Sequence, residues 1–187
     1  MANIPVNELR KGEVFKENGQ PYTVIQYHHV KMGRGNAVIK IKSKNLKTGA
    51  VLEKSFLSGG TVEQADVEKV KVQYLYKAGE TYSFMDNTTF ETIELSSDFL
   101  GDDVYYLKEG NTYQILKFEG EPVSLELPLN IILKVSQTGS GFKGNSVTNM
   151  MKPATLETGL ETLVPNFINE GESIKIDTRS GEYLERG

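Results

Sequence analysis

Short β-strand patterns, separated by turn residues about every ten positions, run through almost the whole chain. The clearest example is residues 36–44, where isoleucines alternate with lysines. Ile39 and Ile41 fall on one face of this strand and the lysines on the other, because successive side chains of a strand point to opposite sides. These lysines are Lys40, Lys42 and Lys44. The chain is therefore predicted to be all-β.

Breaks in this pattern divide the chain into three segments, residues 1–63, 64–128 and 129–187. The first segment is expected to close a small sheet or barrel. The second and third each predict a five-stranded unit of the size of an OB-type barrel. A short helical turn is expected at residues 98–101, and a loop rich in Gly, Ser and Asn at residues 138–149. Strand spacing alone does not distinguish barrels from sandwiches.

Composition excludes several classes of protein. The 187 residues include no cysteine, which excludes disulfides, zinc–thiolate sites and a thiol nucleophile. Mean hydropathy is -0.37, no apolar run is long enough to cross a bilayer, and the N-terminus has no signal-peptide pattern. We therefore expect a cytoplasmic protein without membrane partners.

The net charge of -4 conceals a strong asymmetry. Residues 1–62 carry a net charge of +6, and residues 63–187 carry -10. A local cationic patch is what binds the phosphates of nucleic acids, so the asymmetry favours such a partner despite the acidic pI. The alternative is two solvated surfaces of opposite charge with no partner.

The most basic stretch runs from Val30 to Leu52 and contains no acidic residue. A predicted hairpin tip within it places Arg34 between two glycines, which allow a tight turn and would hold the guanidinium away from the core. The tip residues are Lys31, Met32, Gly33, Arg34, Gly35 and Asn36. Together with Lys40 and Lys42 they are candidates for contacts with nucleic-acid phosphates.

Four rings lie close to this tip in the sequence, and they have two interpretations. Tyr22, Tyr27, His28 and His29 could stack on bases, whereas we expect Tyr22 and Tyr27 to pack in the core. The adjacent histidines point to opposite faces of a strand and cannot ligate one metal together.

Candidates for catalysis are few. Residues 139–144 are rich in glycine but lack the spacing of a Walker-type phosphate loop. No acidic residue pairs with a nucleophile in a recognisable acid–base arrangement. The sequence therefore predicts a non-enzymatic protein that needs no cofactor or metal.

Several motifs, distributed over essentially the whole chain, resemble the bacterial elongation factor P family. They are Asn45–Gly49, Gln73–Tyr76, Phe84–Asp86, Lys152–Gly159, Val164–Glu172 and Asp177–Arg186. This resemblance implies an N-terminal KOW/SH3-like barrel and two OB-type barrels, arranged as an L with the outline of a tRNA. It also implies a monomer that binds the ribosome between the P and E sites, touching the rRNA of both subunits and the P-site peptidyl-tRNA. Such a factor stimulates peptide bond formation and relieves stalling at consecutive prolines.

The resemblance assigns roles to individual residues. Arg34 occupies the position of the family's modified tip residue, so it is either rhamnosylated by an arginine rhamnosyltransferase or left bare. In the third segment, Gly144, Asn145 and Ser146 replace a Gly-Asp-Thr motif linked to codon contacts in the E site. Tyr183 and Arg186 match residues that face the small subunit and tRNA, although Tyr183 could also serve in packing.

Three alternatives to this assignment remain. The elongation factor P-like paralogue is one, but the ending Asp177–Tyr183 favours the factor itself. A general single-stranded RNA-binding OB protein would bind RNA with a steep salt dependence and no effect on proline-rich translation. An enzyme is the third, and the sequence contains no catalytic arrangement to support it.

Overall fold

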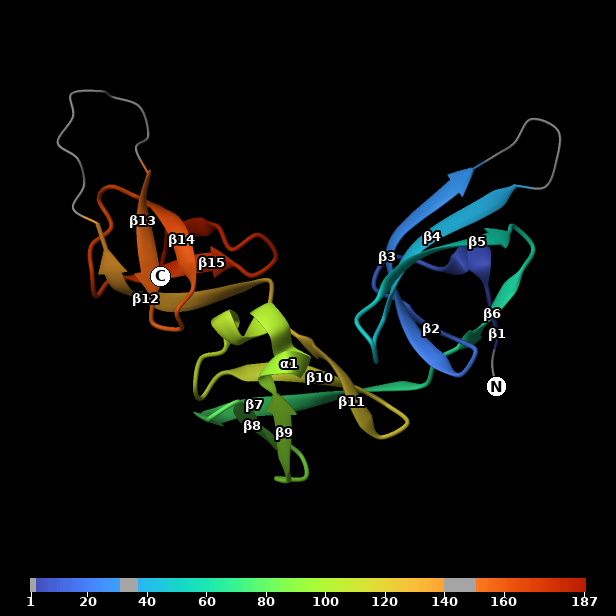
Figure 1. Ribbon diagram of the computed structural model, residues 1–187, viewed down its shortest axis with the longest axis horizontal. Helices are drawn as coiled ribbons and strands as arrows, with labels where there is room; N and C mark the ends of the chain where they lie inside the picture. Colours follow the sequence, from blue (N-terminus) through green and yellow to red (C-terminus); the bar gives the residue numbers. More distant parts are fainter. Residues whose placement is uncertain (1–2, 31–36, 140–150) are drawn as a thin grey trace. The chain divides into compact units, whose positions relative to one another are not determined.

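The computed structural model describes residues 3–30, 37–139 and 151–187 (Figure 1). Their strands form three sheets, which confirms the predicted all-β class. The chain divides into two compact units. One contains Met1–Lys69 and Leu116–Ser124, and the other contains Val70–Ile115 and Leu125–Gly187. No helix in the described ranges is long and apolar enough to cross a membrane.

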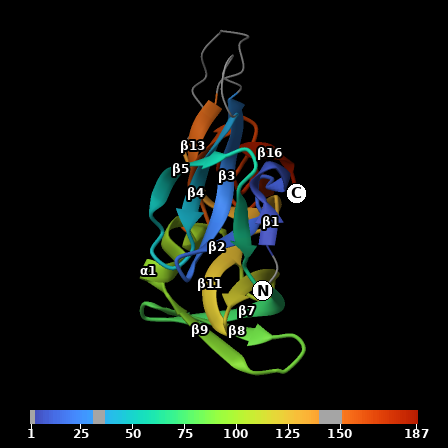
Figure 2. The same cartoon turned by 90° about the vertical axis from the view of Figure 1, so that its right-hand side faces the viewer.

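The first sheet has six strands and lies in the first unit. In spatial order they are β1 (Asn3–Pro5), β6 (Thr61–Gln64), β2 (Val14–Glu17), β3 (Gln20–Val30), β4 (Val38–Asn45) and β5 (Val51–Leu57). A short 3₁₀ helix, η1 (Val6–Glu8), follows β1. Phe15, Ile39 and Ile41 are fully buried in the core that this sheet encloses. Figure 2 shows β3, β4 and β5 side by side, in agreement with their antiparallel pairing.

The second sheet has five strands, as predicted for this part of the chain. In spatial order they are β11 (Glu121–Glu126), β10 (Thr112–Phe118), β7 (Val67–Ala78), β8 (Thr81–Asp86) and β9 (Thr92–Ser96). The predicted helical turn is α1 (Ser97–Leu100), which continues as the 3₁₀ helix η2 (Gly101–Tyr106). Ser96 is the N-cap of α1, and its hydroxyl accepts a hydrogen bond from the backbone N–H of Phe99 at 3.2 Å.

The turn between β10 and β11 packs within the first unit. Phe118 and Val123 lie in one buried cluster with Leu46 from the end of the β4 region. The ammonium group of Lys16 on β2 lies 3.0 Å from a carboxylate oxygen of Glu119 and 5.5 Å from the centre of the Phe118 ring. The hydrogen bond from Lys16 to Glu119 raises the pKa of the lysine. This hairpin end is therefore held by apolar burial and by charge.

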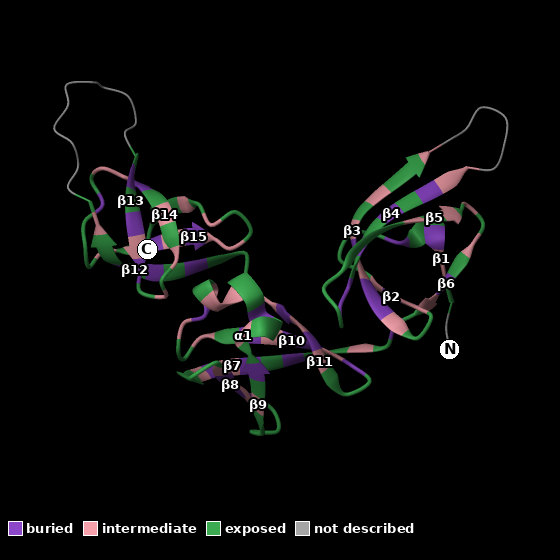
Figure 3. Cartoon of the chain, viewed as in Figure 1, coloured by how far each residue is buried: buried purple, intermediate pink, exposed green. Residues whose placement is uncertain are grey.

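The third sheet also has five strands. They are β14 (Glu161–Pro165), β13 (Met151–Leu156), β12 (Asn130–Thr138), β15 (Ser173–Asp177) and β16 (Tyr183–Arg186). Along β12 buried and exposed residues alternate, as the colours of Figure 3 show. Leu133 on β12 packs on Leu156 and Ile174, and all three are almost completely buried. Period-two patterning thus places one face of this sheet in a core.

Candidate nucleic-acid interface

The long hairpin of β3 and β4 is the framework of the predicted interface. Its antiparallel register runs from Tyr22 opposite Asn45 to Val30 opposite Val38, with one irregularity between Val24 and Gln26. The predicted basic tip lies outside the described residues. Its members are Lys31, Met32, Gly33, Arg34, Gly35 and Asn36. The hairpin arms that lead into and out of that segment are described.

Strand β4 of this hairpin carries the predicted row of lysines. Lys40, Lys42 and Lys44 are exposed, whereas Ile39 and Ile41 are fully buried. This confirms the predicted alternation of Ile39 and Ile41 with the three lysines. The ammonium groups therefore lie on the solvent side of the sheet, where a phosphate could reach them.

Neighbouring strands complete the surface around these lysines. On β3, Gln26 is opposite Lys42 and His28 is opposite Lys40. Residues directly opposite one another in an antiparallel pair project on the same side of the sheet. We call the exposed surface of the three strands the outer face, defined by Gln26, His28, Lys40, Lys42, Lys44, Glu53 and Ser55.

Glu53 is the acidic residue of the outer face, and the sequence analysis did not place it there. It lies on β5 directly opposite Lys42. Its carboxylate is 3.6 Å from the ammonium nitrogen of Lys40, which is its diagonal neighbour. The acid-free stretch of sequence ends at Leu52, one residue earlier. Alternation along β5 puts Glu53 and Ser55 on one side of their strand, but only the cross-strand register shows that this is the side of the lysines.

The tyrosines near the hairpin pack rather than point to solvent. Tyr22 is 9% exposed and stacks on Phe15 with their ring centres 5.6 Å apart. Tyr27 packs partly buried against the same core, and the guanidinium carbon of Arg10 lies 6.0 Å from its ring centre. The expected core role of both tyrosines is therefore confirmed.

The two histidines, in contrast, are exposed. His28 is opposite Lys40 and His29 is opposite Ile39, so adjacent residues belong to opposite faces of the hairpin. Within the described ranges, no group of three or more His, Cys, Asp or Glu residues could hold a metal ion.

The C-terminal candidates lie on β16, in the second unit. Tyr183 is half-buried and packs against the core of the third sheet, as the packing interpretation expected. The Arg186 guanidinium lies 5.0 Å from the centre of the Phe167 ring, and its Nε is 3.5 Å from a carboxylate oxygen of Glu172. Arg186 is thus oriented by two neighbours while more than half of its side chain stays exposed. Gly144, Asn145 and Ser146 lie outside the described residues.

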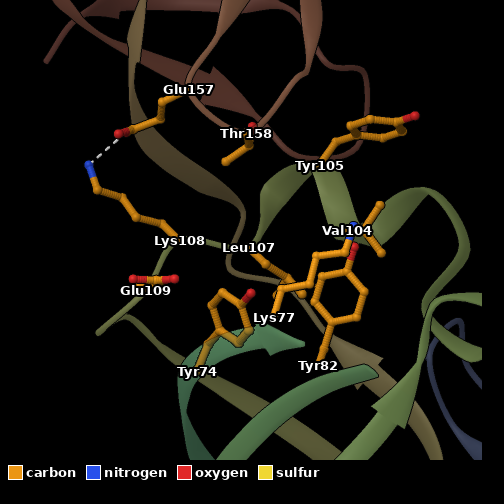
Figure 4. A pocket seen from close by; sticks show the side chains of 10 residues that line it. All are labelled: Tyr74, Lys77, Tyr82, Val104, Tyr105, Leu107, Lys108, Glu109, Glu157 and Thr158. Atoms are coloured by element: carbon orange, nitrogen blue, oxygen red, sulfur yellow. Dashed lines mark ion pairs between the residues drawn. The ribbon is translucent and has the colours of Figure 1, made fainter. Parts of the chain in front are cut away.

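A cleft of about 520 Å³ in the second unit also contains charged residues (Figure 4). Two of its charged groups are paired, since the ammonium nitrogen of Lys108 lies 2.9 Å from a carboxylate oxygen of Glu157. Glu157 also accepts a hydrogen bond from the backbone N–H of Lys134. Burial alone would raise the pKa of Glu157, but these hydrogen bonds outweigh it and lower that pKa.

Two tyrosines in and beside this cleft, Tyr74 and Tyr113, are structural. Tyr74 is 5% exposed, and burial followed by the negative charge of Glu109 raises its pKa to about 12. Tyr113, next to the cleft, donates a hydrogen bond to the backbone carbonyl of Tyr106 at 2.9 Å. Tyr106 itself packs against the core of the third sheet. The cleft therefore lies at a junction built from paired charges and buried rings, unlike the open outer face.

Each of the three sheets corresponds to one family match, and together these matches define the class, a translation factor built from KOW-like and OB domains. Residues 5–62 match the description "Elongation factor P (EF-P) KOW-like domain", residues 67–125 match "Elongation factor P (EF-P) OB domain", and residues 131–186 match "Elongation factor P, C-terminal". The solved structure of eukaryotic translation initiation factor 5A from Methanococcus jannaschii has a similar fold, with a TM-score of 0.55 at 20% identity. That similarity covers 67% of this chain and 94% of the other.

Curated relatives match the chain over nearly its full length. Elongation factor P of Clostridium botulinum (strain Hall) is 47% identical over 183 residues, which cover 98% of this chain and 99% of the relative. Elongation factor P of Dictyoglomus turgidum is 45% identical with the same coverage. The chain belongs to the elongation factor P family, whose members are translation factors rather than enzymes.

Proposed function

We propose that this protein acts as a monomeric elongation factor P in the cytoplasm, on the ribosome between the P and E sites. There it contacts the rRNA of both subunits and stabilises the P-site peptidyl-tRNA, which relieves stalling at consecutive prolines. Family membership over the whole chain supports this proposal. The structural observation that carries it is the outer face, whose lysines are exposed on a rigid strand beside the predicted tip.

The same proposal divides the chain into domains at residues 63/64 and 128/129. The limits of the three family matches support these boundaries. The first domain would present the tip and the outer face to the acceptor end of the tRNA. The third would present Arg186, which Phe167 and Glu172 hold in place.

Such a factor needs no acid, base or nucleophile of its own. Proline is a constrained secondary amine and attacks the peptidyl ester poorly. Holding the CCA end in register lowers the entropic part of the barrier, because well-aligned reactants avoid the loss of translational and rotational freedom. The ribosome would perform the chemistry, and the outer face would contribute positioning through phosphate contacts.

Two states of Arg34 are compatible with this role, rhamnosylated and bare. A guanidinium is protonated at physiological pH and is therefore a poor nucleophile, so sugar transfer requires a dedicated enzyme. Intact-mass analysis of the natively expressed protein distinguishes the states. An increment of one deoxyhexose on the tip peptide identifies the rhamnosylated form, and an unshifted mass rules it out.

The functional test is translation of an oligoproline reporter in an extract depleted of the endogenous factor. Wild type should restore full-length product, and Arg34→Ala and the double variant Lys40→Gln/Lys42→Gln should restore less. Lys71→Gln/Lys77→Gln is the matched control for the double variant, because it also neutralises two exposed lysines, in the second unit. If wild type does not relieve the stall, the proposal is wrong. A general RNA-binding protein would give that result while still binding RNA.

A further inference from the structure

The outer face contains one carboxylate among its cations. Glu53 is directly opposite Lys42, the middle lysine of the row, and its carboxylate lies 3.6 Å from the ammonium nitrogen of Lys40 at one end. Its side chain is 63% exposed, and that of Lys40 is 49% exposed. The carboxylate is therefore at the same surface that a phosphate would approach.

Stability does not account for a glutamate at this position. An ion pair between two side chains this exposed contributes little to folding, because water screens the attraction and two long side chains lose freedom. Ser55, on the same face of β5, shows that a small neutral residue is accommodated in this strand. A glutamate here lowers the positive potential of the face instead.

We propose that Glu53 is a specificity-determining residue of the outer face. Its carboxylate pairs with the ammonium group of Lys40, which is then not free to bind a phosphate. The same negative charge repels phosphates that approach without a defined geometry. Flexible single-stranded RNA, which can adapt its phosphates to any free cation, is thereby rejected most strongly. A folded tRNA presents phosphates at fixed spacing and gains less from a freed Lys40. This inference rests on the proposed contact between the outer face and tRNA.

Counterion release gives the expected size of the effect. Each added contact between a lysine and a phosphate of single-stranded nucleic acid steepens the salt dependence, log K against log[salt], by about 0.7. At about 0.1 M salt, one such contact is equivalent to about fivefold in affinity. Removing the Glu53 charge should free one contact, so a gain of this size is expected for a flexible strand.

The test measures binding of the full chain to two probes, a short poly(U) RNA and a deacylated tRNA, over a range of salt concentrations. Glu53→Gln is compared with wild type and with Glu119→Gln. The control removes the same charge from a similarly exposed glutamate that is also paired with a lysine, Lys16, outside the outer face. Thermal unfolding of each variant verifies that it folds, and Glu53→Ser repeats the test with a shorter side chain.

We expect Glu53→Gln to bind poly(U) about fivefold more tightly than wild type at about 0.1 M salt, with a steeper salt dependence. Its affinity for tRNA should rise less than twofold, and Glu119→Gln should match wild type for both probes. Equal behaviour of the two glutamine variants overturns the inference, as does an equal gain for both RNAs. If wild type and Lys42→Gln bind tRNA equally, the proposed contact of the outer face itself is wrong.

Discussion

The lysines of the outer face and the cations of the third sheet have the same chemistry but different partners. Lys42 and Lys44 form no ion pair with any residue that the structure describes, and Lys40 shares one exposed carboxylate. In the third sheet, Lys175 lies 2.8 Å from a carboxylate oxygen of Glu185, and Arg179 pairs with Asp177. A cation that has its own carboxylate fixes a turn or a strand pair, whereas one without a carboxylate remains available to phosphate. We therefore expect the position of the acids, more than the number of lysines, to separate a binding surface from a structural one.

The strongest test of this contrast removes the row of lysines. The triple variant Lys40→Gln/Lys42→Gln/Lys44→Gln should lose about 25-fold in affinity for tRNA at about 0.1 M salt, because Lys42 and Lys44 each lose a phosphate contact of about fivefold while Lys40 is already paired with Glu53. Fluorescence anisotropy over a range of salt concentrations measures both the affinity and its salt dependence. Thermal stability should stay close to that of wild type, since the three side chains are exposed.

A matched triple neutralisation on β7, outside the outer face, is the control for total charge. Lys69, Lys71 and Lys77 are three exposed lysines of β7, and their triple glutamine variant changes the net charge equally. Its affinity for tRNA should fall far less. A loss as large as that of the outer-face variant would mean that net charge, rather than the outer face, governs binding.

The second prediction concerns a cation that has a carboxylate of its own. Lys108→Met should destabilise the protein by about 1 kcal/mol, because Glu157 loses its cation and part of its hydrogen bonding. For a chain of this size the melting temperature should fall by about 2–4 °C. Lys77→Met is the control, since Lys77 lines the same cleft and lies over the Tyr82 ring. Both variants should bind tRNA as wild type does. If Lys108→Met bound tRNA more weakly, a lysine paired with a carboxylate would contribute to binding like the lysines of the outer face, which would contradict the contrast.

The alternation of isoleucine and lysine predicted the solvent side of β4, because period two depends on the strand alone. Sequence reasoning could not place Glu53 beside Lys40, because cross-strand neighbours depend on register, which tertiary pairing sets. The short strands β1 and β6 were missed for a related reason. Each has only three or four residues, too few for a pattern, and they are strands because they pair with one another.

The ion pair of Asp177 with Arg179, in the turn that follows β15, should make the stability of the fold depend on pH. The side chain of Arg179, and then its backbone N–H, hold the pKa of Asp177 at about 2. Since an unfolded aspartate titrates near pH ~4, this carboxylate stabilises the fold above that pH, and its contribution is lost as the pH falls towards about 2. Asp177→Asn should therefore be less stable than wild type near neutral pH, with a difference that shrinks in acid. Urea midpoints measured from neutral to acidic pH check this, and a difference independent of pH would contradict it.

The smallest effect on tRNA binding is expected for Lys54. This residue lies on β5 beside the outer face, but its side chain projects to the other side of the sheet. Its ammonium group pairs with Glu17 and lies 3.6 Å from the centre of the Tyr22 ring, and burial lowers its pKa. Lys54→Met alone leaves Glu17 without its cation and should cost about 0.5–1 kcal/mol, whereas adding Glu17→Gln should return stability to within about 0.5 kcal/mol of wild type. Neither variant should change affinity for tRNA by more than about twofold, because the lost charge contributes no phosphate contact. If Lys54→Met weakened tRNA binding as much as a single outer-face substitution, the contribution of a lysine would not depend on its exposure or on its pairing with a carboxylate.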